Sequence, residues 1–88
     1  MTAIEIIELL KRHKLKHTEK RIGLLKIFRE NERELQIHEV IFEMRKQFPC
    51  VSQQTILGNL EIFVDAGLLV KHKINSEITF SMSTEKVS

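Results

Sequence analysis

Residues 48–67, FPCVSQQTILGNLEIFVDAG, describe one helix together with the signals for both of its ends. The Ser52 hydroxyl can accept a hydrogen bond from a free backbone amide of the first turn, so Ser52 is expected to cap the helix start. Gly67 stands where a left-handed C-terminal cap is expected. The sequence thus predicts a helix from Ser52 to Ala66. Its expected buried stripe consists of apolar residues three or four positions apart, Ile56, Leu60 and Phe63.

Three further helices are predicted upstream of this segment, because apolar residues again recur every three to four positions. They cover 3–13, the stretch from Thr18 to about Asn31, and about 37–47. The charged stretch Glu30 to Glu34 is expected to form a loop. The expected inward-facing residues are Ile4, Ile7 and Leu10, then Ile22, Leu25 and Phe28, then Val40, Ile41 and Met44.

The apolar period changes after Gly67. Residues 69–74 and 77–82 alternate roughly in twos around Asn75-Ser76, a pattern typical of a β-hairpin. The predicted fold is mainly α with a small β-hairpin: a winged helix-turn-helix of four helices and then a two-stranded wing. Residues 1–83 are expected to form this domain, and 84–88 a polar tail.

The composition fits a single small globular domain: 88 residues, of which 42% are hydrophobic and 30% charged. One cysteine excludes an internal disulfide. The N-terminus has no signal-peptide pattern, and no apolar run approaches the roughly 18 residues that span a bilayer. A cytoplasmic protein without a membrane partner is therefore expected.

Catalytic and metal-binding motifs are weak. No Ser-His-Asp or Cys-His set and no glycine-rich phosphate loop occurs, and so small a core is expected to leave no room for a substrate pocket. His13 and His17 have the four-residue spacing of two metal ligands, but they straddle a predicted helix end and have no third ligand nearby. Cys50 is expected to be a small, semi-buried thiol. Neither an enzyme nor a cofactor, metal ion or small-molecule substrate is predicted.

The net charge of +2 is small, but its distribution is uneven. Six cations lie within 11–21, against one acid, Glu19; they are Lys11, Arg12, Lys14, Lys16, Lys20 and Arg21. Such a cluster can neutralise phosphates and release counterions, although a solvated loop would look the same. Lys71 and Lys73 share one face of a strand, which suits either contact with a nucleic-acid backbone or protection of a sheet edge.

The outward face of the helix that follows Ser52 indicates DNA recognition less clearly than the two groups of cations do. It is predicted to present Gln54, Leu57, Gly58, Glu61 and Asp65, with Gln53 at its edge. Gln can pair with adenine and Leu57 could touch a thymine methyl group, but the two acids repel phosphate. A winged-helix module that binds another protein through Leu57 and Gly58 is therefore the alternative hypothesis.

Three blocks of this sequence resemble motifs of the ferric uptake regulator (Fur) family. They are LKHTEKR at 15–21, FPCVSQQT at 48–55 followed by Asn59-Leu60, and DAGLLVKH at 65–72. Together they cover about residues 10–82 in the family's order, and the Asn59-Leu60 pair is similar to the peroxide-responsive branch. The resemblance implies the N-terminal winged-helix DNA-binding domain of a bacterial transcriptional regulator.

The resemblance also implies contacts with double-stranded DNA. Gln53, Gln54 and Thr55 would enter the major groove, while Lys16 would reach the minor groove or backbone and Arg21 would clamp a phosphate. The expected DNA-binding residues are Lys14, Lys16, Thr18, Arg21, Ser52, Gln53, Gln54, Thr55, Leu57, Asn59, Lys71 and Lys73.

The sequence departs from the family pattern at three points. Leu57-Gly58 stands where members have an aromatic and a polar DNA reader. Glu34 and Ser81 are the nearest positions to two ligands of the family's regulatory metal site, so this site is not carried over. The family's dimerisation and metal-sensing half has no counterpart in these residues, which leaves homodimer formation open.

Overall fold

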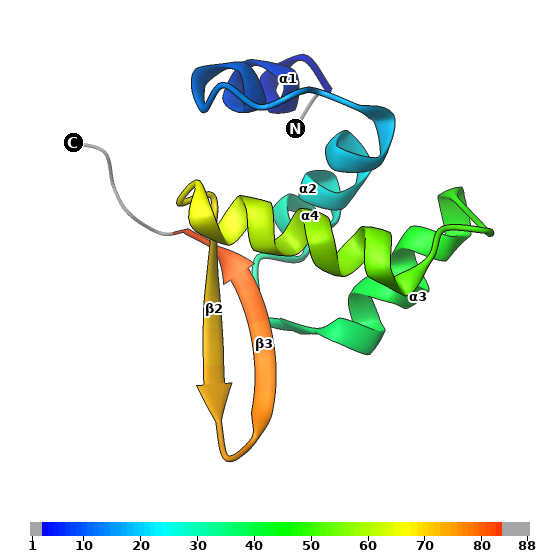
Figure 1. Cartoon of the computed structure of the whole chain (residues 1–88), viewed down its shortest axis with the longest axis vertical. Coiled ribbons are helices and arrows are strands. Elements are labelled where there is room, and N and C mark those ends of the chain that lie inside the picture. The colour runs from blue at the N-terminus through cyan, green and yellow to red at the C-terminus, as the bar shows by residue number, and fades with distance from the viewer. Residues whose placement is uncertain (1–2, 84–88) are drawn as a thin grey trace.

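The computed structural model describes residues 3–83 (Figure 1), so the expected tail 84–88 lies outside the described residues. Four helices and three short strands follow one another in the order that the sequence predicted, with one strand added. The elements are α1 (Ala3–Arg12), α2 (Glu19–Asn31), β1 (Leu35–Gln36), α3 (Ile37–Gln47), α4 (Gln53–Asp65), β2 (Leu69–Ile74) and β3 (Glu77–Met82).

The predicted helix caps are confirmed. Thr18 Oγ1 accepts a hydrogen bond from the Arg21 backbone N–H at 3.2 Å, and Ser52 Oγ accepts one from the Thr55 N–H at 3.0 Å. Each bond satisfies a first-turn amide that has no partner inside its helix. Gly67 takes the expected left-handed conformation after α4, with φ of +84°. These local signals fix where α2 and α4 begin and where α4 ends.

The predicted hairpin is also confirmed, but it belongs to a three-stranded sheet. Asn75 and Ser76 both have positive φ, 51° and 69°, as a tight turn between twisted strands requires. The expected two-stranded wing was incomplete, because β1 pairs antiparallel with β3 and places Leu35 opposite Phe80. A strand of two residues is too short to show a period of two, so β1 has no recognisable pattern in the sequence.

One core joins all four helices to the base of the sheet. Its fully buried side chains include Leu10, Leu25, Phe28, Met44, Ile56, Leu60, Phe63 and Phe80. One expectation about facing was wrong. Ile4 is 70% exposed, because α1 buries the face of Ile6 and Leu10. On α2, Leu25 and Phe28 are buried as expected, Leu24 is buried beside them, and Ile22 is half-buried and packs against the core.

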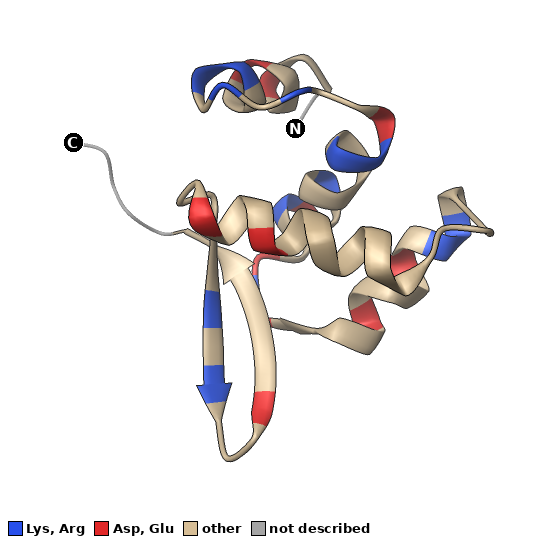
Figure 2. Cartoon of the chain, viewed as in Figure 1, with Lys and Arg blue, Asp and Glu red and all other residues tan. Residues whose placement is uncertain are grey.

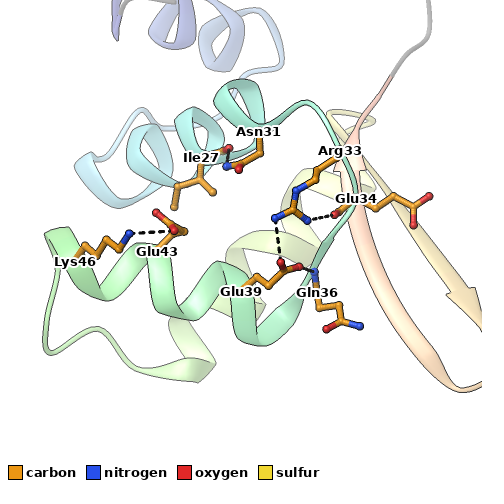
Figure 3. Close-up of polar contacts among 8 residues, drawn as sticks. All are labelled: Ile27, Asn31, Arg33, Glu34, Gln36, Glu39, Glu43 and Lys46. Atoms are coloured by element: carbon orange, nitrogen blue, oxygen red, sulfur yellow. Dashed lines mark hydrogen bonds and ion pairs between the residues drawn. The ribbon is translucent and has the colours of Figure 1, made fainter.

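A polar network closes the start of α3 (Figure 3). The Gln36 backbone N–H donates to Glu39 Oε1 at 2.8 Å, and Arg33 Nη2 donates to Glu39 Oε2 at 3.0 Å. Both bonds favour the ionised carboxylate, and they lower the pKa of Glu39, with the Arg33 bond as the main cause. A lowered folded-state pKa means that this contribution to stability is present above the unfolded pKa and is lost as the pH falls.

Side-chain hydrogen bonds tie the sheet to the segment before α3. Thr79 Oγ1 of β3 donates to Glu34 Oε1 at 2.8 Å, and Gln36 Nε2 donates to Glu77 Oε2. Together with the pairing of β1 and β3, they hold one side of the hairpin against the helices. The hairpin is therefore attached to the body along β3, from Phe80 to Glu77, and the Asn75-Ser76 turn lies just beyond these contacts (Figure 1).

The end of α1 contains a strained residue. Lys14 has φ of +59°, a left-handed conformation in which a side chain costs about 1 kcal/mol relative to glycine. The Lys14 N–H donates to the Lys11 carbonyl at 2.9 Å, and the Leu15 N–H donates to the Leu10 carbonyl at 2.9 Å. These two bonds form the helix-ending motif in which glycine is the usual residue at the strained position.

Candidate nucleic-acid interface

Helix α4 lies between the two cationic parts of the molecule. We call residues 11–21 the basic arm and the β2–β3 hairpin, residues 69–82, the wing. Arg21 of the basic arm donates from Nε to Asn59 Oδ1 of α4 at 2.9 Å. Lys71 of the wing lies with its Nζ 3.4 Å from Glu61 Oε2 of the same helix. The basic arm and the wing therefore flank α4 on two different edges.

The exposed face of α4 spans the interval between these two edges. At about 100° per residue, Asn59 and Glu61 lie on nearly opposite sides of the helix, and Gln54 and Gly58 lie between them. Both are exposed, and a Cβ built on Gly58 would meet no atom within 4 Å. The helix thus presents an open strip bordered by the basic arm on one edge and by the wing on the other.

The charges on this surface are segregated (Figure 2). In the basic arm, the side chains of Lys11, Arg12, Lys14, Lys16 and Lys20 are all exposed. In the wing, Lys71 and Lys73 are exposed on the same strand, as the alternation predicted. Helix α4 itself carries acids and no cation, so the positive charge beside the strip comes from neighbouring elements.

The structure brings some of the predicted site residues together. A surface notch of about 520 Å³ is lined by Lys16, Thr18, Arg21, Thr55 and Asn59, together with Glu19, Lys20 and Phe48. Gln53 and Gln54 are exposed on the first turn of α4, next to its cap at Ser52. Lys71 and Lys73 lie apart from this notch, on the wing. The predicted residues thus form two groups on either side of α4 rather than one cluster.

The surroundings of two predicted site residues differ from those that the sequence indicated. Leu57 was expected to face outward, but it is half-buried and packs against the core, because it lies past Glu61 on the side toward the sheet. The Asn59 carboxamide is hydrogen-bonded at both ends: its oxygen accepts from Arg21, and Nδ2 donates to the Thr55 carbonyl at 3.1 Å. No local pattern could reveal a contact between positions 21 and 59.

The residues nearest to the family's metal ligands do not fit a metal site. The Glu34 carboxylate accepts a hydrogen bond from Thr79, and Ser81 Oγ is hydrogen-bonded to His72 Nε2 at 2.9 Å. Within residues 3–83, no group of three or more His, Cys, Asp or Glu side chains is arranged to hold a metal ion. The His13 ring nitrogen Nδ1 is hydrogen-bonded to the Leu9 carbonyl at 3.0 Å.

Two smaller expectations were wrong. Cys50 is exposed rather than semi-buried, because it lies in the loop before α4 and outside the core. The surface does have a groove of several hundred Å³: about 880 Å³ lies between α1, the end of α2 and the base of the wing. It is open and lies outside the core, which is why the size of the core did not limit it. Its lining is Glu5, Phe28, Arg29, Glu32, Arg33, Glu34, Ser81 and Met82.

None of the helices in the described part of the chain is both long enough and apolar enough to cross a bilayer.

Known proteins resemble this chain in both sequence and fold. The sequence profile of the ferric uptake regulator family matches residues 12–87. The ferric uptake regulation protein of Staphylococcus epidermidis is 31% identical over 83 residues, which are 94% of this chain and 60% of that protein. Its counterpart in Staphylococcus aureus is 30% identical over 94% of this chain and 61% of that protein. The chain thus spans about three-fifths of the length of these relatives.

Solved structures give the same fold. The ferric uptake regulator of Vibrio cholerae, whose DNA-binding domains undergo structural rearrangement, aligns with a TM-score of 0.81 at 22% identity. That alignment covers 91% of this chain and 63% of the Vibrio chain. The Campylobacter jejuni peroxide stress regulator aligns with a TM-score of 0.70 at 31% identity, over 91% of this chain and 59% of its own.

Proposed function

Because this chain belongs to the ferric uptake regulator family, we propose that it binds double-stranded DNA as the docking domain of a bacterial cytoplasmic transcriptional regulator. The N-terminal turn of α4 enters the major groove and presents Gln53, Gln54 and Thr55 to base edges. The remaining contacts go to the backbone and hold the protein in register. They are made by Lys14, Lys16 and Thr18 of the basic arm, Ser52 at the helix start, and Lys71 and Lys73 of the wing.

The observation that carries this proposal is the placement of α4 between two cationic flanks. The Arg21–Asn59 and Lys71–Glu61 contacts border the exposed strip of the helix, so a duplex against the strip would meet lysines on both sides. Phosphate neutralisation supplies most sequence-independent affinity. A DNA duplex has two sugar-phosphate strands, one on each side of its major groove. When α4 lies in that groove, one strand can meet the basic arm and the other the wing.

Base reading by this domain is proposed to be weak. The exposed strip offers only glutamine and threonine side chains in the first turn of α4, followed by Gly58 and then Glu61 and Asp65. Helix α4 contains no arginine or lysine, the residues that most often pair with guanine. We therefore expect modest sequence preference from one copy, with two copies on half-sites about one helical turn apart giving greater specificity.

The alternative of a protein-interaction module loses its main support. It required Leu57 to be an exposed apolar anchor beside Gly58, whereas Leu57 is half-buried and packs against the core. The acid Glu61 is also paired with a wing lysine. DNA binding is the function that these contacts favour.

A salt titration tests the proposal. We expect fluorescence anisotropy with a labelled duplex to give log Kd rising linearly with log salt concentration. The slope of log Kd against log salt concentration should be near 3.6, which corresponds to about four phosphate contacts. The expected contacts are made by Lys14, Lys16, Lys71 and Lys73. Binding that is undetectable at roughly 50 mM salt, where phosphate contacts are strong, would refute DNA docking.

Glu61→Gln is expected to tighten DNA binding. The Glu61 carboxylate pairs with Lys71 at 3.4 Å and faces the proposed backbone, so its removal leaves phosphate as the only anionic partner of Lys71 and abolishes a repulsion. The gain is bounded by the effect of one full phosphate contact, about eightfold in affinity at ~0.1 M salt and about 0.9 in the salt slope. Anisotropy titrations of the variant measure both.

The matched control for this variant is Glu32→Gln. Glu32 is an exposed carboxylate that follows the last residue of α2, about 17 Å along the helix from Arg21. An equal gain in affinity from both variants would show a general effect of net charge and would contradict the proposed role of Glu61.

Lys14→Gly is expected to separate stability from binding. Glycine relieves the left-handed strain at φ of +59°, which raises the unfolding free energy by about 1 kcal/mol and Tm by roughly 4–8 °C. The same change removes a proposed phosphate contact, so DNA affinity should fall by about eightfold at ~0.1 M salt. Thermal denaturation and anisotropy measure the two effects.

Glu32→Gly provides the control for Lys14→Gly, because Glu32 also ends a helix in the left-handed conformation, with φ of +50°. This variant should gain similar stability without losing DNA affinity. If Lys14→Gly bound DNA as tightly as the unchanged protein, Lys14 would not be a contact residue.

A further inference from the structure

The side chains of Arg21 and Asn59 form a bridge between the basic arm and α4. Arg21 Nε donates to Asn59 Oδ1 at 2.9 Å, across 38 positions of sequence. The same guanidinium donates from Nη1 to the backbone carbonyl of Lys16 at 3.2 Å. One planar group thus contacts both α4 and the loop that precedes α2.

The partners of the two side chains fix their orientation. Asn59 is held at both ends of its carboxamide, since Oδ1 accepts from Arg21 and Nδ2 donates to the Thr55 carbonyl of its own helix. Arg21 holds two partners with different nitrogens of a rigid fork, a geometry that the single ammonium of lysine cannot reproduce. Both residues are half-buried, unlike the exposed lysines beside them.

The loop between α1 and α2 has few other attachments to the rest of the domain. The backbone amides of His13, Lys14 and Leu15 all donate back to carbonyls of α1. Leu15 packs against the core, and the carbonyl that follows it, that of Lys16, is the one that Arg21 holds. The bridge therefore sets the position of this loop relative to α4.

We propose that Arg21 and Asn59 are positioning residues for DNA binding rather than contacts with DNA. They hold the loop so that Lys14 and Lys16 reach the backbone while α4 occupies the groove. This inference rests on the proposed function. It differs from the expectation that Arg21 clamps a phosphate, because its charge serves here to orient two protein groups.

A double-mutant cycle with a salt series tests the bridge. Arg21→Lys keeps the charge but loses the fork, and Asn59→Ala removes the acceptor. Each is expected to weaken duplex binding by roughly fivefold, with the salt slope unchanged, because no phosphate contact is removed. The DNA affinity of the double variant should be no lower than that of the single variant with the lower affinity, because the two substitutions break the same bridge. Lys16→Ala is the control that makes the slope shallower by about 0.9.

Amide hydrogen exchange in the free protein tests the same bridge without DNA. The amides of Lys14 and Leu15 are hydrogen-bonded and report on the loop, while the amide of the buried Leu60 reports on α4. Both single variants should speed exchange at Lys14 and Leu15 several-fold and leave Leu60 unchanged. A change of similar size at all three amides would indicate global destabilisation and would overturn the positioning role.

The two experiments separate the inference from the function. If the unchanged protein failed to bind the duplex while exchange still responded as expected, DNA docking would be wrong and the bridge would stand as a structural contact only. If the protein bound the duplex but Arg21→Lys and Asn59→Ala had independent, additive effects, or Asn59→Ala had none, the bridge would not position the loop.

Discussion

Replacing Lys14 and Lys16 together by alanine is expected to weaken duplex binding by roughly sixtyfold at about 0.1 M salt. Both side chains are exposed in the basic arm, on the edge of α4 that the Arg21–Asn59 bridge defines. Each phosphate contact contributes about 0.9 to the salt slope, which corresponds to about eightfold in affinity at this concentration. Anisotropy titrations over a salt series should show a slope shallower by about 1.8.

The matched control replaces Lys26 and Arg29 by alanine. Lys26 lies about 140° around α2 from Arg21, and Arg29 lies about 12 Å farther along the helix and lines the groove beside α1, so the net charge changes equally but at another surface. The control should retain most of the affinity and of the slope. Equal losses in both double variants would mean that affinity follows overall charge and that the basic arm has no special role.

Phe80→Ala is expected to remove 3–5 kcal/mol from the free energy of unfolding, the range for deleting a buried phenylalanine side chain. Phe80 is 2% exposed and lies where the sheet meets the helices, opposite Leu35 on β1 and Lys71 on β2. A domain of this size has a total stability of roughly 4–13 kcal/mol, so the loss is a large fraction of it. Urea denaturation followed by circular dichroism measures the change.

Ile74→Ala is the control for Phe80→Ala. Ile74 is an apolar residue of the same hairpin, but it is 62% exposed near the turn, and its truncation should cost less than about 0.5 kcal/mol. If Phe80→Ala also cost less than about 1 kcal/mol, β3 would not be anchored in the core, and the wing would not be held in a fixed position.

Local signals made most of the fold predictable. The hydroxyls of Thr18 and Ser52 and the glycine at 67 mark helix ends through contacts within a few residues, and the structure confirms all three. Strand β1 was missed because its two residues obtain their hydrogen bonds from β3, far along the chain. Ile4 was placed inside wrongly because a short helix rich in isoleucine and leucine fits more than one buried face.

The candidate site was less predictable than the fold. Charge clustering in the basic arm and alternation in the wing located the exposed lysines, because both patterns are visible in the sequence. The Arg21–Asn59 bridge depends on where the first turn of α2 lies relative to α4 and has no sequence signal. The half-buried state of Leu57 likewise depends on the position of the sheet beside α4.

The most direct test of DNA docking maps the contact surface by NMR, with ¹⁵N-labelled protein titrated with a short duplex at low salt. We expect shifts at Lys14, Lys16, Gln54 and Thr55 and in the wing around Lys73, with little change at Arg29 and Glu32 in the groove behind the wing base. Shifts confined to that groove, with the basic arm and the start of α4 unaffected, would contradict docking through α4.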